Sequence, residues 1–168
     1  STGTPWLKET ALYLSARTAL NQAQDTIYDT YGVPQLERVD KPALAHAEQG
    51  FDSYLKTYPQ GQYAASARGL LRRVYWLADD SDKLAAAYAR ELTQTGDAQR
   101  NVSVDELVEE ADQKLLMVTR GTFNTPMIQV VSDLMMMRAH TPPSLSRADL
   151  EQQKAVFAND PALYDYLL

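Results

Sequence analysis

The sequence contains no cysteine and only two histidines, His46 and His140. The absence of cysteine excludes disulfide bonds, cysteine nucleophiles and thiolate metal sites, and it fits the cytosol and the periplasm equally. Most zinc sites and nucleophilic triads need more histidines, or histidines in pairs. The chain also lacks a glycine-rich phosphate loop and a Gly-x-Ser-x-Gly nucleophile motif. We therefore expect a protein that is not an enzyme and that has no metal site and no cofactor.

Basic residues are few, and long hydrophobic runs are absent. The 16 Lys and Arg residues are outnumbered by 22 Asp and Glu residues, which gives a net charge of −6. A mildly acidic chain is poorly suited to nucleic acid or to an anionic membrane surface. No apolar run approaches the ~18 residues that a membrane span needs. We expect no nucleic-acid partner and no direct membrane span.

Residues that favour sheet are also scarce, because 10 Val and 2 Ile stand against 22 Ala and 21 Leu. Unbranched side chains lose little rotamer freedom in a helix, so this composition favours helix over strand. A hydrophobic content of 45% is enough for a packed core. We expect residues 1–168 to form a single all-α domain.

Capping residues, prolines and glycines predict where each helix begins and ends. Ser103 with Glu106 three residues later has the pattern of a capping box. The predicted helices span residues 5–31, 42–57, 62–78, 83–95, 103–118, 126–139, 146–157 and 160–168. Because the connections are short and no strand is expected, the predicted architecture is an array of antiparallel helical hairpins.

Residues 47–69 carry the most specific local pattern. It places small and aromatic residues at intervals that suit paired helices: Ala47, Phe51, Tyr54, Pro59, Gly61, Tyr63, Ala64, Ala67 and Gly69. Tyr54 and Tyr88 are 34 residues apart. The pattern resembles the second helix of a tetratricopeptide repeat followed by the first helix of the next repeat. It is most similar to the repeats of bacterial envelope lipoproteins of the outer-membrane-assembly type.

This resemblance covers residues 43–95. Residues 5–31 lack the Trp-x-x-Leu-Gly-x-x-Tyr pattern of a first repeat helix, and the connector over residues 32–41 is long, so we expect a degenerate array. The resemblance implies a scaffold that binds a protein partner. It also implies a periplasmic, outer-membrane-associated location, and it allows a lipid anchor in the full-length protein.

Residues of the third predicted helix are the candidates for binding a partner, because aromatic residues and arginine dominate interface hot spots. The candidates are Tyr63, Arg68, Arg72, Arg73 and Trp76. A groove between stacked hairpins would present them to a partner segment. The alternative is structural: the aromatic rings pack between helices, and the arginines form salt bridges with Asp79, Asp80, Asp82 or Glu91.

Two other functions stay open on the sequence alone. The chain ends on the apolar stretch Tyr164–Leu168, so we expect it to be a fragment of a longer protein. It is then either a scaffold or a helical accessory domain of an enzyme whose catalytic part lies outside this chain. A third possibility is a small-ligand or metal carrier that uses the methionines at 135–137.

Overall fold

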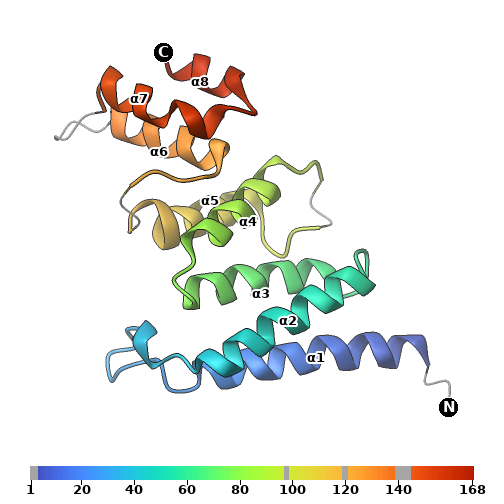
Figure 1. Cartoon of the computed structure of the whole chain (residues 1–168). Helices are drawn as coiled ribbons and strands as arrows, with labels where there is room; N and C mark the ends of the chain where they lie inside the picture. Colours follow the sequence, from blue (N-terminus) through green and yellow to red (C-terminus); the bar gives the residue numbers. More distant parts are fainter. Residues whose placement is uncertain (1–3, 97–98, 119–120, 139–144) are drawn as a thin grey trace.

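The computed structural model describes residues 4–96, 99–118, 121–138 and 145–168, and it confirms the all-α class (Figure 1). Within these residues the only β-structure is an isolated bridge between Tyr28 and Pro34. The α-helices are α1 (Pro5–Gln24), α2 (Lys41–Thr57), α3 (Ala64–Leu77), α4 (Ser81–Thr93), α5 (Val104–Ala111), α6 (Pro126–Arg138), α7 (Arg147–Gln153) and α8 (Pro161–Leu167). Short helical turns are η1 (Leu36–Arg38), η2 (Asp112–Leu116) and η3 (Lys154–Phe157).

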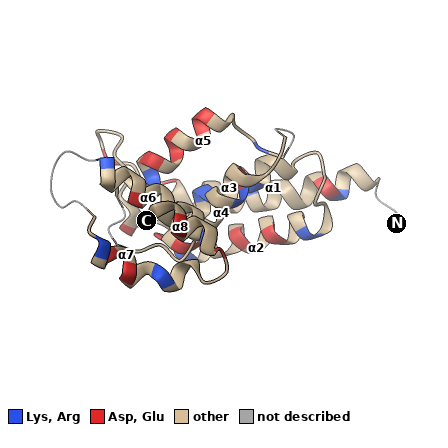
Figure 2. Ribbon diagram, turned by 90° about the horizontal axis from the view of Figure 1, so that it is seen from above, with Lys and Arg blue, Asp and Glu red and all other residues tan. Residues whose placement is uncertain are grey.

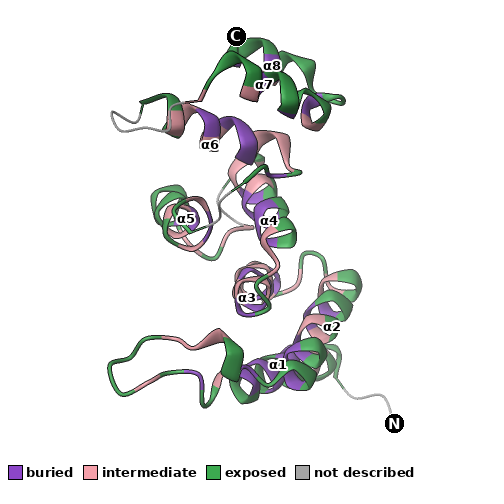
Figure 3. Ribbon diagram, turned by 60° about the vertical axis from the view of Figure 1, so that its left-hand side comes forward, coloured by how far each residue is buried: buried purple, intermediate pink, exposed green. Residues whose placement is uncertain are grey.

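The helices stack in sequence order from α1 at one end to α8 at the other (Figure 1). Buried side chains form three hydrophobic clusters along this stack. The first joins α1, α2 and α3, the second joins α4 to α5, η2 and the start of α6, and the third joins α6 to α7, η3 and α8. Figure 3 shows the buried residues on the inner faces of these helices.

The helices α1 and α2 pack closely against each other, because small residues lie at their contact. Ala47 in α2 is fully buried. Gly50 lies so close to α1 that an added Cβ would be 2.7 Å from the Cβ of Ala16. The α2 helix begins where predicted, because Asp40 accepts a hydrogen bond from the backbone N–H of Ala43 and Pro42 occupies the first turn.

The first helix is shorter than the sequence predicts: it ends at Gln24, whereas the prediction extends it to residue 31. Asp29 holds the last part of the predicted helix in a turn instead, because its carboxylate accepts hydrogen bonds from the backbone N–H groups of Tyr31 and Val33, both at 2.9 Å. Such local side-chain to backbone bonds compete with helix formation. Gly32 completes the turn with a positive φ of 77°.

The turn between α2 and α3 is fastened to α1 by Tyr54 and Glu9. The Tyr54 hydroxyl donates to Glu9 Oε1 at 2.7 Å and accepts from the backbone N–H of Tyr63 at 2.9 Å. Glu9 Oε1 also accepts from the backbone N–H of Gln62. Burial, together with the bond to Glu9, raises the pKa of Tyr54 to about 12. The phenol of Tyr54 and the carboxylate of Glu9 therefore hold the turn against α1.

Two other predicted helices are correct in position but change their helical type. The capping box at Ser103 is confirmed, and α5 then runs only to Ala111 before the π-helical turn η2. The N–H of Met117 donates to the carbonyl of Asp112, five residues earlier. The helix predicted over residues 146–157 likewise changes into the 3₁₀ turn η3 after Gln153.

Candidate protein-binding groove

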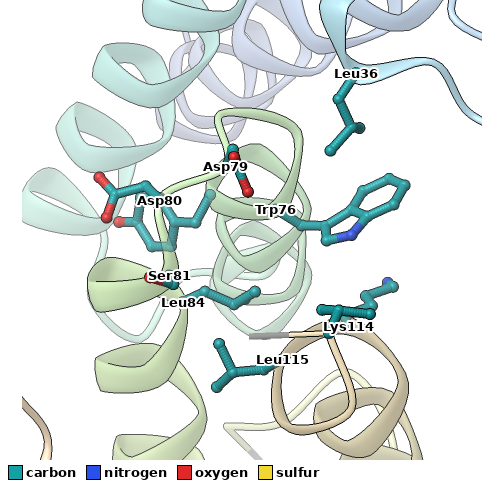
Figure 4. Close-up of a pocket in the computed structure, with 10 residues that line it drawn as sticks. Leu36, Trp76, Asp79, Asp80, Ser81, Leu84, Lys114 and Leu115 are labelled. Atoms are coloured by element: carbon teal, nitrogen blue, oxygen red, sulfur yellow. The ribbon is translucent and has the colours of Figure 1, made fainter. Parts of the chain in front are cut away.

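A hollow of about 400 Å³ opens between η1, the C-terminal end of α3, the start of α4 and η2. We call it the Trp76 groove. Its lining is Leu36, Tyr75, Trp76, Asp79, Asp80, Ser81, Leu84, Lys114, Leu115 and Val118. Figure 4 shows Leu36 on one side of the Trp76 indole and Lys114 on the other. The groove lies where the first and second core clusters meet, since Tyr75 and Trp76 pack against both.

Two cations approach the ring of Trp76. The guanidinium carbon of Arg73 lies 5.8 Å from the ring centroid, and the Lys114 ammonium lies 5.5 Å from it. Both distances are within the range of a cation–π interaction. Arg73 is itself fixed, because it donates to Gln24 Oε1 at 2.5 Å and to the Tyr28 hydroxyl at 2.7 Å. Trp76 and Arg73, both predicted to bind a partner, therefore lie together at the groove.

Arg72 lies elsewhere, and its burial corrects the prediction that it belongs to a partner surface. Its exposed fraction is 1%, and its guanidinium forms a buried ion pair with Glu91. It also pairs with Glu110 at 3.2 Å and donates to Asn101 at 3.0 Å. For Arg72 the structure therefore supports the alternative to partner binding, which is a salt bridge with Glu91.

The charges around Arg72 balance one another inside the protein. Burial alone would lower the pKa of Arg72, but the bond to Glu110 and the charge of Glu91 outweigh it and raise that pKa. Burial would raise the pKa of Glu110, and the bond and charge of Arg72 reverse this, so it is lowered. Lys114 shares Glu110 at 3.3 Å. This cluster links α3, α4 and α5.

Tyr63 and Arg68 lie at the opposite end of α3, away from the groove. The Tyr63 ring stacks on Tyr13 of α1 with centroids 4.4 Å apart. Arg68 donates to the carbonyl of Pro59 at 2.8 Å, so it fastens the turn before its own helix. Eight residues of helix separate Arg68 from Trp76, which is about 12 Å at the rise of an α-helix. These two residues therefore do not join Arg73 and Trp76 in one site.

Several groove residues were not among those predicted. Leu36, Lys114, Leu115 and Val118 come from elements that are distant in sequence from Trp76, whereas Asp79 lies in the turn directly after α3. Helical periodicity gives no indication of them, because it reports which residues share a face of one helix and not which elements meet. The connector gives little indication either, because Leu36 is one of several apolar residues in it, together with Val33 and Val39.

Exposed hydrophobic side chains lie on the elements that flank the groove. The loop of residues 25–35, whose Tyr28 contacts Arg73, carries Tyr31 with an exposed fraction of 90%. Directly after η2, Met117 and Val118 are 72% and 64% exposed. Interaction surfaces commonly combine such exposed apolar groups with a partly buried aromatic anchor.

A second hollow of about 490 Å³ adjoins the first, because Leu36 and Asp79 line both. The helix α2 supplies much of its wall, including Leu44, Ala45 and Glu48. Charged residues elsewhere lie mostly on outer faces, and Figure 2 shows acidic residues along α5 and α2. Both hollows have mixed linings, in which apolar side chains such as Leu36 lie beside charged ones such as Asp79.

Within the described part of the chain, no group of three or more His, Asp and Glu residues could hold a metal ion, and no helix is long and apolar enough to cross a membrane. His46 is exposed, and His140 lies outside the described residues. No family model, no curated protein and no solved structure matches this chain.

Proposed function

We propose that this chain is a scaffold domain of a bacterial cell-envelope protein, and that it binds a segment of a protein partner in the Trp76 groove. The observation that carries the proposal is the position of Trp76. Its indole is half-buried in the wall of the groove, and the cations Arg73 and Lys114 lie 5.8 Å and 5.5 Å from its ring centroid. Tryptophan and arginine in such a setting are the residues that most often dominate binding energy.

The π-helical turn η2 supports the same site. π-Helices are rare, and they occur mostly as single turns that are often found at functional sites. Here the turn places Lys114 over Trp76 and places Leu115 in the wall of the groove. An unusual backbone segment thus supplies two of the residues that a partner would contact.

The location of the protein rests on the sequence alone. The tetratricopeptide-like pattern of residues 43–95 resembles the repeats of envelope lipoproteins, whereas the absence of cysteine fits the cytosol and the periplasm equally. We therefore place the domain in the periplasm, associated with the outer membrane.

Site-specific photocrosslinking tests the proposal. A photoreactive phenylalanine analogue replaces Val118 at the groove, and in a matched variant it replaces Tyr166, which is similarly exposed on α8 at the far end of the stack. We expect a discrete adduct with one envelope protein from position 118 only. Trp76→Ala should remove that adduct while circular dichroism shows the helices intact. The same adducts from both positions, or none from position 118, would contradict the proposal.

A further inference from the structure

The turn between α3 and α4 has an unusual residue at its centre. Asp79 has a φ of +56°, the only positive φ among the non-glycine residues that the structure describes. The N–H of Asp80 donates to the carbonyl of Tyr75, and the N–H of Asp79 donates to that of Trp76. These bonds form a Schellman motif, in which the left-handed position is usually glycine because a Cβ is unfavourable there. Aspartate at this position thus provides a carboxylate where glycine would suit the backbone better.

The carboxylate of Asp79 lies at the junction of the two hollows, since Asp79 lines both. It forms no ion pair with any residue in the described part of the chain. The neighbouring acids differ, because Lys83 pairs with Glu48 at 2.6 Å and with Asp80 at 3.6 Å. Asp79 is therefore an exposed carboxylate at the edge of the groove, and no cation among the described residues pairs with it.

Arg73 lies three residues before Trp76 in α3, whereas Asp79 lies three residues after it, and the Arg73 guanidinium carbon is 5.8 Å from the centroid of the indole. Its two hydrogen-bond acceptors, Gln24 Oε1 and the Tyr28 hydroxyl, are both neutral, and no carboxylate among the described residues pairs with it. The nearby Lys114 differs, since it already shares the carboxylate of Glu110. One cation, Arg73, and one anion, Asp79, thus lie before and after Trp76 along the chain, and neither forms an ion pair within the described residues.

We propose, building on the function proposed above, that the Trp76 groove binds an extended partner segment in one fixed direction. An apolar side chain of the segment lies against Trp76, Leu36 and Leu115. An acidic side chain on one side of it pairs with Arg73, and a basic side chain on the other side pairs with Asp79. Complementary charges of this kind determine register and partner choice more than they determine affinity.

Peptide selection followed by charge-coupling cycles tests this proposal. Random 12-residue peptides are displayed and selected on the intact 168-residue chain. The peptides that bind should carry an acidic and a basic residue on opposite sides of an apolar residue, in a constant order. Replacing the basic residue of a selected peptide by Gln should weaken its binding to the unaltered chain about 3–10-fold. The same peptide change should have almost no effect on binding to Asp79→Gly, a variant whose backbone turn is retained.

The acidic residue of the peptide should show the same coupling with Arg73→Gln. Asp165→Asn and Arg147→Gln, which alter exposed charges on α8 and α7, serve as matched controls and should leave both peptide effects unchanged. Peptides that lose binding in Trp76→Ala but show no coupling to Asp79 or Arg73 would overturn the directional proposal and leave the groove as the binding site. Peptides that bind Trp76→Ala as well as the unaltered chain, or a selection without binders, would contradict the groove itself.

Discussion

The C-terminal helices contain a fully buried carboxylate, which is unusual because burial disfavours a charged group. Asp133 of α6 has an exposed fraction of 0%. Its neighbours are amides: Gln129 Nε2 donates to Oδ1 at 2.7 Å, and the Gln153 amide nitrogen donates to Oδ2 at 2.8 Å. No cation in the described residues pairs with it. Burial raises the pKa of Asp133, although the two hydrogen bonds partly oppose this effect.

We expect Asp133→Asn to stabilise the protein at neutral pH. The folded-state pKa is raised above its unfolded value, so the folded protein binds more protons between the two values. The stability that protonated Asp133 contributes is present below the unfolded pKa, near 3.8, and is lost as pH rises through the folded pKa. The gain in Asp133→Asn, about 1 kcal/mol or 2–4 °C in Tm, should therefore appear at pH 7 and shrink toward pH 4.

Thermal unfolding across this pH range measures the effect, with Asp165→Asn as the control because Asp165 is exposed on α8. The control should show little change at any pH. A lower Tm of Asp133→Asn at pH 7 would contradict the prediction, because it would show that the charged carboxylate stabilises the folded protein.

Single residues also show what sequence reasoning could find in the groove. Trp76 and Arg73 could be selected as candidates from residue type alone, because tryptophan and arginine are common at interfaces, and their role in binding stays a prediction. Arg72 is adjacent to Arg73 and has the same side chain, yet it points into the protein toward Glu91. Which of two neighbouring arginines is buried depends on where α4 and α5 pack, and that information is absent from the local pattern.

At the scale of the element, the close contact between α1 and α2 forms the base of the first core cluster. Gly50 is half-buried within α2, where glycine costs about 1 kcal/mol relative to alanine in helix propensity. The close approach of Ala16 explains its presence, since an added Cβ would lie 3.2 Å even from the Cα of Ala16. The backbones must separate to admit any larger side chain.

We therefore expect Gly50→Ala to destabilise the protein by about 1–3 kcal/mol, despite the better helix propensity of alanine. Ala16→Gly should restore space, so the double variant should be more stable than the sum of the two single changes predicts. Ala11→Gly, at an exposed position of α1, is the matched control and should give no such rescue. Chemical denaturation of the three single variants, and of the double variants that combine Gly50→Ala with Ala16→Gly or with Ala11→Gly, measures the coupling. Additive changes in the free energy of unfolding would show that Gly50 and Ala16 do not constrain each other.

Helix bounds could be predicted where a capping side chain or a proline marks them. Asp40 before α2 and Ser103 before α5 are such positions. The end of α1 could not be predicted in this way, because Asp29 acts through a turn that forms after the helix has already stopped. Gly69 shows a related limit: close packing was expected there, but its neighbour is Asn101 of a loop and not another helix.

At the scale of the whole molecule, each core cluster involves only elements that follow one another along the chain. The first and second clusters are joined through Tyr75 and Trp76, the residues that also line the groove. The third cluster packs around Phe157, Tyr164 and Leu167 and shares no residue with the other two. Stability in such a stack is approximately a sum of local contributions and neighbour interfaces.

This organisation predicts that damage to one end of the stack stays local. Phe157→Ala removes a buried ring from the third cluster, and we expect a loss of about 3–5 kcal/mol in the local stability of α6, α7 and α8. Phe51→Ala makes the matching change in the first cluster, where Phe51 is fully buried. Hydrogen exchange read by mass spectrometry should show faster exchange in α6–α8 for Phe157→Ala and in α1–α3 for Phe51→Ala.

The backbone amides around the groove should stay protected from exchange in Phe157→Ala and lose this protection in Phe51→Ala, because Trp76 packs against the first cluster and not the third. Equal acceleration along the whole chain in both variants would instead mean that the stack unfolds as one cooperative unit.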